Sequence, residues 1–390
     1  MSTRRRVAIT GMGTVSSLGL DLDRFWDQVC SAPPAPVHTP VRELDAKAWF
    51  TAKQLRRSDP FARYGGVAGQ LAVTDAGLDP AAVAPRRAGV VMATVYGALE
   101  SLEAEQANLV DDGEGAVSPF LTVASCENVV ASMLSAHLGW RGPSRVIVTA
   151  CAGGTHAVSE GADLIRSGRC DVVVAGGSQG RITPVLMAAY RNLRVLSPSG
   201  WVRPFDRRRE GFAFAEGAAA LVLEDLDAAR ARGARIYAEV LGSGHTNDAD
   251  SLVSPSGSGA VECIEDALVD AGLDAADVVH VNAHGTGTTM NDAQEAEALH
   301  RVFGTPPPVT SIKRVLGHAA GASGAFEAVA AVLTVHHGVV PSLGTDVEPD
   351  AELDLDLVVG DPRRIEPGPV LSNSFGLGGH NGCLVVGPVR

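Results

Sequence analysis

Short runs of β-branched and other apolar residues alternate along the chain with longer stretches in which apolar residues recur at helical spacing. The apolar runs predict buried strands at residues 6–10, 89–93, 146–150, 171–175, 217–224, 236–241, 278–282, 370–373 and 383–386. The helical spacing predicts helices at residues 22–30, 54–78, 99–108, 126–138, 153–168, 226–233, 259–271, 292–303 and 321–337. Because strands and helices alternate, we expect an α/β fold with largely parallel strand pairing.

The two parts of the chain echo each other. A strand followed by a glycine pair occurs in Val174-Ala-Gly-Gly177 and again in Phe375-Gly-Leu-Gly-Gly379. This repetition predicts an N-terminal half, residues 1–235, and a similar C-terminal half, residues 236–390.

Composition and charge limit which partners, cofactors and cellular locations are expected. The 390 residues carry a formal net charge of -13, which argues against a general affinity for nucleic acid. No apolar run is long enough to span a membrane, and the start of the chain lacks the apolar segment of a signal peptide. The six cysteines form no Cys-x-x-Cys pair, so neither a zinc site nor a disulfide framework is indicated. We therefore expect a cytoplasmic protein with reduced thiols and no metal.

The strongest chemical signal is a strand that runs into Cys151. A helix is predicted to start at about Gly153, which would set the sulfur in the positive end of a helix dipole. That position favours the thiolate and predicts a nucleophile. The alternative is a small cysteine buried in the core.

Three later stretches, around His284, Lys313 and Phe375, resemble loops of an active site at strand ends. His284 is followed by glycines and by Thr286 and Thr288, whose hydroxyls could bind an amide-bearing ligand. The alternative is a polar turn capped by Asp292. The third stretch, around Phe375, is rich in glycine, and its alternative is a bulge at a domain seam.

Lysine occurs at only three positions, Lys47, Lys53 and Lys313. Lys313 and His318 precede a helix of small residues, and Glu327 lies within that apolar helix. A buried carboxylate needs a partner, so we expect an ion pair between Lys313 and Glu327. The alternative is a purely structural pair beside a core histidine.

Taken together, these stretches resemble the β-ketoacyl synthases, the condensing enzymes of the thiolase superfamily. The shared motifs, in the family's order, are Ile9-Thr-Gly-Met-Gly13, Ser118-Pro-Phe120, Thr149-Ala-Cys151, Arg203-Pro-Phe-Asp206, His284-Gly-Thr-Gly-Thr288, Lys313 to His318 and Asn373-Ser-Phe-Gly376. The resemblance implies a five-layer αβαβα thiolase-like fold and a dimer. It also implies an acyltransferase in which an acyl group on Cys151 condenses with a malonyl group on an acyl carrier protein.

The resemblance also implies the residue roles. Hydrogen bonds from His284 and His318 would stabilise the thioester oxygen during decarboxylation, and Lys313 and Glu327 would orient His318. Backbone N–H groups of Cys151 and Phe375 would form a second oxyanion hole, and Phe375 would gate the acyl pocket. Thr286 and Thr288 would bind the phosphopantetheine arm of the carrier, and no cofactor or metal is needed. The candidate basic patch for the acidic carrier protein consists of Arg56, Arg57, Arg203, Arg207 and Arg208.

Several positions depart from the family pattern, namely Ala152, Gln179, Ser251 to Val253, and Leu377. They favour a type II polyketide or polyene system, in which such a chain pairs with a homologous chain-length factor. The alternative is fatty acid elongation by a homodimer. Two other classes stay open, a non-catalytic partner of the chain-length-factor kind and a Cys/His hydrolase. A degradative thiolase would need a second catalytic cysteine, for which Cys383 is the candidate.

Overall fold

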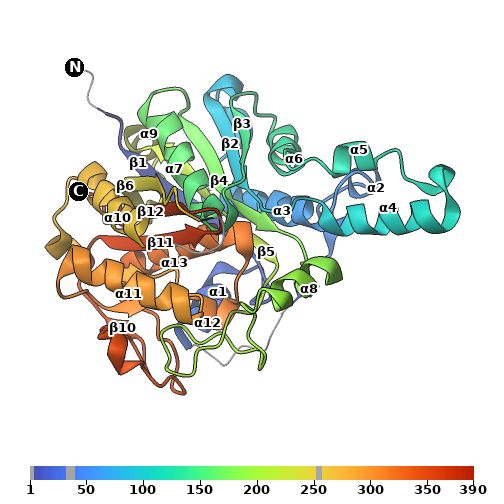
Figure 1. The fold of residues 1–390 in the computed structure, drawn as a ribbon. Coiled ribbons are helices and arrows are strands. Elements are labelled where there is room, and N and C mark those ends of the chain that lie inside the picture. Colours follow the sequence, from blue (N-terminus) through green and yellow to red (C-terminus); the bar gives the residue numbers. More distant parts are fainter. Residues whose placement is uncertain (1–3, 32–39, 252–256) are drawn as a thin grey trace.

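The computed structural model describes residues 4–31, 40–251 and 257–390 (Figure 1). Its centre is a ten-stranded mixed sheet in the order β3-β2-β4-β5-β1-β6-β12-β11-β7-β8. The strands are β1 (Val7–Val15), β2 (Ala88–Ala93), β3 (Ser144–Ile147), β4 (Val172–Gln179), β5 (Gly217–Asp225), β6 (Ala238–Asn247), β7 (His280–Asn282), β8 (Val309–Thr310), β11 (Val370–Gly376) and β12 (His380–Gly387). A separate pair consists of β9 (Val339–Val340) and β10 (Arg363–Arg364).

The sheet consists of two five-stranded parts with the same pairing pattern. Read inward from each edge, β3-β2-β4-β5-β1 and β8-β7-β11-β12-β6 both begin with two parallel pairings and continue with two antiparallel ones. The expectation of largely parallel pairing is therefore wrong. Strand β12 follows β11 after only three residues, 377–379, which is too short for a crossover and forces an antiparallel hairpin.

Helices α7 (Gly153–Arg166) and α13 (Ser323–His337) contact each other and strands of both parts of the sheet. A Cβ atom at Gly324 would lie 2.3 Å from the hydroxyl oxygen of Thr155, so the two backbones approach more closely than a side chain would allow. The apolar core that includes both helices is continuous with both parts of the sheet. These helices form the central layer.

The outer faces of the sheet are covered by a second set of helices. Helices α3 (Pro60–Asp75) and α6 (Val129–Leu138) cover one part, while α10 (Ser258–Ala271), with α11 (Thr289–Phe303) beside it, covers the other. The two parts of the sheet therefore form two separate layers, with α7 and α13 between them and the other helices outside. This is the five-layer order that the sequence resemblance implied (Figure 1).

The remaining helices are α1 (Leu22–Ser31), α2 (Ala52–Leu55), α4 (Leu99–Asp112), α5 (Leu121–Ala124), α8 (Pro184–Asn192), α9 (Leu226–Ala231) and α12 (Lys313–Leu316). The single helix expected at residues 54–78 is divided into α2 and α3. Asp59 caps α3 by accepting a hydrogen bond from the N–H of Phe61, and Pro60 occupies its first turn. Among the described residues, no helix has the length and apolarity to cross a membrane.

The link between α9 and β6, residues 232–237, joins the two parts of the chain. The predicted boundary between residues 235 and 236 falls in this link, and the division into two domains there stays a prediction.

Candidate active site

Cys151 lies where β3 gives way to α7, as the sequence predicted. The residue before it, Ala150, has a φ of 49°, in the left-handed region that residues other than glycine rarely adopt. Ala150 is also the first residue of a 3-10 turn, Ala150–Ala152, which leads into α7 at Gly153. This tight turn presents the sulfur to a cavity of 590 Å³ and leaves the side chain half-buried.

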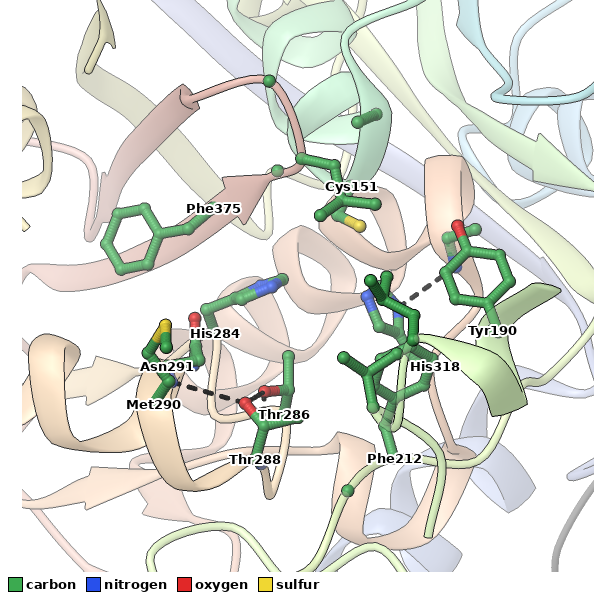
Figure 2. Close-up of a pocket in the computed structure, with 18 of the residues that line it drawn as sticks. Cys151, Tyr190, Phe212, His284, Thr286, Thr288, Met290, Asn291, His318 and Phe375 are labelled. Carbon is green, nitrogen blue, oxygen red and sulfur yellow. Dashed lines mark hydrogen bonds between the residues drawn. The ribbon is translucent and has the colours of Figure 1, made fainter. Parts of the chain in front are cut away.

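His284 and His318 face the sulfur of Cys151 from the other part of the chain (Figure 2). His284 follows β7, and His318 follows the short helix α12. The sulfur and one nitrogen from each imidazole all lie within 4.8 Å of one another. The rings are buried and perpendicular, with centroids 5.6 Å apart and an interplanar angle of 83°. The structure therefore brings together three of the five residues predicted to be catalytic, Cys151, His284 and His318.

Each imidazole is held through its Nδ1 atom. The ammonium of Lys313 donates to Nδ1 of His284 at 3.1 Å and to the backbone oxygen of His284 at 2.6 Å. The N–H of Ala320 donates to Nδ1 of His318 at 3.1 Å, and the hydroxyl of Ser323 lies 2.8 Å from the same atom. Because both Nδ1 atoms accept, each neutral ring carries its proton on Nε2. Lys313 thus orients His284, which corrects the expectation that it would orient His318.

Burial lowers the pKa of His284 and of His318 well below the ordinary value, and the nearby Lys313 lowers both further. Both rings are therefore neutral hydrogen-bond donors at neutral pH. Thiolate and imidazole are also zinc ligands. Here each ring would have to give up its Nε2 proton before it could bind a metal.

The thiol of Cys151 does not titrate as the helix dipole alone predicts. Burial raises its pKa to about 11, against the opposing effects of Lys313 and of the backbone N–H groups of Leu377 and Cys151. The resting residue is therefore a thiol at neutral pH.

The backbone at the end of β11 and in the turn after it touches Cys151. The resemblance assigned the second oxyanion hole to the N–H groups of Cys151 and Phe375; the N–H of the turn that interacts with the sulfur is that of Leu377. A Cβ atom at Gly376 would lie 3.1 Å from the backbone nitrogen of Cys151, so any larger residue would press the two backbones apart by a few tenths of an ångström. The ring of Phe375 instead stands edge-on to His284, with centroids 5.8 Å apart.

Lys313 and Glu327 form the expected ion pair, and both side chains are 1% exposed. Ser374 also donates to Glu327, at 3.2 Å. A second buried carboxylate, Glu295, escaped the sequence analysis. It accepts the N–H groups of His284 and Gly285, each at 2.8 Å, so it fixes the backbone that carries His284. Burial raises the pKa of Glu295 to about 7.

The cavity extends from Cys151 in two directions (Figure 2). Beside His284 its wall is polar and includes Thr286 and Thr288, whose hydroxyl oxygens lie 2.9 Å apart. Beside His318 the wall is apolar and aromatic, formed by Val95, Tyr96, Tyr190, Leu193, Val195, Phe212 and Phe214.

The five arginines of the predicted carrier patch do not line the cavity. The guanidinium of Arg208 donates to Asp206 at 2.8 Å, and Arg207 pairs with Glu348. Arg57 stacks on Phe120, and Arg203 lies over Trp201. Carboxylates of the same chain thus compensate part of this positive charge, so the patch is weaker than the sequence suggested. A different arginine, Arg194, lines the cavity.

The departures from the family pattern lie close to the site where the structure describes them. Ser251 and Leu377 line the cavity, while Ala152 and Gln179 are buried beside it. Leu252 and Val253 lie outside the described residues. Cys383 is fully buried and donates to the side chain of Asn373, so it does not reach the cavity as a thiolase cysteine would.

Comparison with known proteins identifies the architecture. Residues 36–229 match the model of the beta-ketoacyl synthase N-terminal domain, and residues 237–344 match that of the C-terminal domain. The chain belongs to the β-ketoacyl synthase family. This synthase is 35% identical to 3-oxoacyl-(acyl-carrier-protein) synthase 2 of Staphylococcus aureus (strain COL), over 99% of both chains.

Two solved structures resemble the synthase closely. The ishigamide ketosynthase/chain length factor has a TM-score of 0.95 at 31% identity, and the alignment covers 99% of this chain and 100% of that one. A type II PKS acyl-carrier protein in complex with its ketosynthase bound to the hexaketide gives 0.91 at 26% identity, with the same coverage. The α/β thiolase-like fold and the condensing-enzyme family, both expected from the sequence, are confirmed.

Proposed function

We propose that this synthase catalyses the decarboxylative Claisen condensation of an acyl group on Cys151 with a malonyl group carried by an acyl carrier protein. The observation that carries the proposal is the pair of neutral imidazoles at the sulfur. Both turn an Nε2 proton toward the cavity, because both Nδ1 atoms are engaged as acceptors.

In the first half-reaction, the sulfur of Cys151 attacks the carbonyl of an acyl thioester. The acyl–sulfur bond of the carrier breaks and a new thioester forms on Cys151. The thiol proton of Cys151 leaves with the departing pantetheine sulfur, so no net proton is released and a high resting pKa is tolerated. The N–H groups of Cys151 and Leu377 interact with the sulfur, and this closeness supports a role for them as donors to the tetrahedral oxyanion.

In the second half-reaction, a malonyl thioester occupies the polar side of the cavity. The bond to its carboxylate breaks and carbon dioxide leaves, while electrons move onto the thioester oxygen. His284 and His318 donate hydrogen bonds to that oxygen, which are strongest in a buried site. The resulting carbanion attacks the acyl-cysteine, and the Cys151 thiolate leaves and is protonated. The product is a β-ketoacyl thioester longer by two carbons.

We assign the synthase to a type II polyketide or polyene system with a homologous chain-length factor as partner. The similarity to the ishigamide ketosynthase/chain length factor supports this assignment. Elongation of fatty acids by a homodimer is the second candidate, supported by the 35% identity to the Staphylococcus aureus synthase. In either system the substrates arrive on the phosphopantetheine arm of an acyl carrier protein in the cytoplasm, and the protein needs no resident cofactor.

The site geometry disfavours the two rival classes. A hydrolase needs an imidazole with a free lone pair toward the cysteine, whereas both rings here face it with an N–H group. A non-catalytic partner has no need of a nucleophile, two histidines and a buried ion pair in one cavity.

The proposal is tested by intact-protein mass spectrometry with acyl- and malonyl-loaded carrier protein, on the chain alone and with a candidate partner. We expect an acyl adduct on Cys151 that is consumed to give a β-ketoacyl carrier, and no adduct in Cys151→Ala. An adduct on the chain alone favours the homodimer, and one that requires the partner favours the polyketide system. Release of free acid without extension, or no adduct in either case, would overturn the proposal.

A further inference from the structure

Two tyrosines close the apolar side of the cavity. Tyr96 lies in the segment between β2 and α4, and Tyr190 lies on α8, so each comes from a different element. Their hydroxyl groups are hydrogen-bonded to each other across the wall. Cys151 contributes to the electrostatic environment of both phenols, which places the pair near the acyl-carrying sulfur.

An aromatic frame holds Tyr190 in this position. Its ring meets Phe214 edge-on, with centroids 4.8 Å apart, and Phe212 packs edge-on against His318 at 5.0 Å. Figure 2 shows Tyr190 on the His318 side of Cys151, away from Thr286 and Thr288. The pair therefore faces the part of the cavity that an acyl chain on Cys151 would enter, not the part assigned to the carrier arm.

One of the two hydroxyl protons is not used in the hydrogen bond between the tyrosines. Two phenols carry two protons, and the hydrogen bond between them uses one. The second proton has no acceptor among the residues that the structure describes. Burial raises the pKa of both phenols, so both stay protonated at neutral pH.

The neighbouring wall residues Val95, Leu193 and Val195 are apolar, and Arg194 between the last two carries only donors. The carboxylate of Glu210, which also lines the cavity, already accepts from Ser197 and Ser199. The two tyrosines are half-buried. A saturated acyl chain that covers their hydroxyls would displace water from the pair and leave this donor unsatisfied, which costs free energy. A carbonyl or hydroxyl oxygen on the chain would accept the proton.

We propose that Tyr96 and Tyr190 make the synthase selective for acyl groups that carry an oxygen along the chain over saturated chains of the same length. This inference rests on the proposed function and names its substrate class. It assigns the two tyrosines as determinants of specificity rather than as parts of the reacting centre.

The test measures the rate of Cys151 acylation, by intact mass, from carrier proteins loaded with hexanoyl, 3-oxohexanoyl or 5-oxohexanoyl groups. In the native protein, at least one oxo substrate should exceed hexanoyl by about tenfold in kcat/KM, the effect of one neutral hydrogen bond. In Tyr96→Phe/Tyr190→Phe this ratio should fall to about one, since both hydroxyls are gone and the rings remain. The two single variants identify which phenol donates to the substrate.

Tyr64→Phe is the matched control, because it removes a phenol hydroxyl outside the cavity and should keep the ratio. A native preference for hexanoyl over both oxo substrates would overturn the inference. So would a ratio that survives in the double variant, or rates that fall equally for all substrates, as a purely structural role predicts. If no substrate acylates Cys151, the proposed function fails instead.

Discussion

Lys313→Ala removes the cation at the centre of the buried polar groups. The ammonium donates to Glu327 and to two atoms of His284, and the lysine and glutamate side chains are both 1% exposed. In the variant, Glu327 keeps only the hydroxyl of Ser374 as a donor, at 3.2 Å. Loss of one partner of a buried pair leaves the other charge uncompensated, so we expect the free energy of unfolding to fall by about 3–5 kcal/mol.

The loss should depend on pH in a defined direction. Burial already raises the pKa of Glu327, and removal of Lys313, which opposes this, raises it further. A carboxyl whose pKa is higher in the folded than in the unfolded state is neutral in both states at pH values below its unfolded pKa, about 4.3. Under those conditions it imposes no penalty on the free energy of unfolding. The penalty then grows as the pH rises toward the folded pKa. The destabilisation should therefore be larger at pH 8 than at pH 5.

Urea unfolding of four proteins at both pH values provides the assay. Lys313→Ala is compared with the native chain, with Lys313→Ala/Glu327→Gln, and with Lys53→Ala, which alters an exposed lysine. The double variant should recover much of the stability, because the uncompensated charge is gone, but not the condensing activity, because His284 still lacks its donor. A destabilisation below about 1 kcal/mol with no pH dependence would refute the reasoning. So would a double variant no more stable than the single one.

Two further predictions concern catalysis. His284→Ala or His318→Ala should slow malonyl decarboxylation by about 10²–10³-fold, because each removes an oxyanion donor, and should slow acylation of Cys151 less. Single-turnover assays measure the two steps separately, and a larger effect on acylation than on decarboxylation would contradict these roles. Gly376→Ala should slow Cys151 acylation by about tenfold, because its Cβ atom would press on the nucleophile backbone at 3.1 Å. Gly115→Ala, where nothing lies within 4 Å, is the control, and equal acylation rates in the two variants would show that the close approach is unimportant.

Much of the site could be predicted because its chemistry is local in sequence. The strand, the turn at Ala150 and the helix that present Cys151 are consecutive, so apolar periodicity and small residues were enough to find them. The Lys313–Glu327 pair followed from one principle, that a carboxylate inside an apolar helix needs a partner. Glu295 gave no such signal, because α11 is partly polar around it.

The errors share a different origin. Strand direction was misjudged because alternation of elements does not reveal which strands become neighbours. The strands predicted at 370–373 and 383–386 were also too short, so the three-residue turn between β11 and β12 was not apparent. The arginine run was read as free positive charge, yet Glu348 pairs with Arg207 across a separation of 141 residues. The sequence around Arg207 or around Glu348 gives no indication that the two residues pair.

The sequence by itself therefore predicted the α/β class, the place of Cys151 between a strand and a helix, and the buried ion pair, since each depends on residue type and nearby spacing. The roles expected for the two histidines came from the family's motifs. Only the tertiary structure decided which imidazole Lys313 holds, that the N–H of Leu377 meets the sulfur, and that the hydroxyls of Tyr96 and Tyr190 meet in the cavity wall. The physical reason is that hydrogen bonds act over about 3 Å in space and are indifferent to distance along the chain.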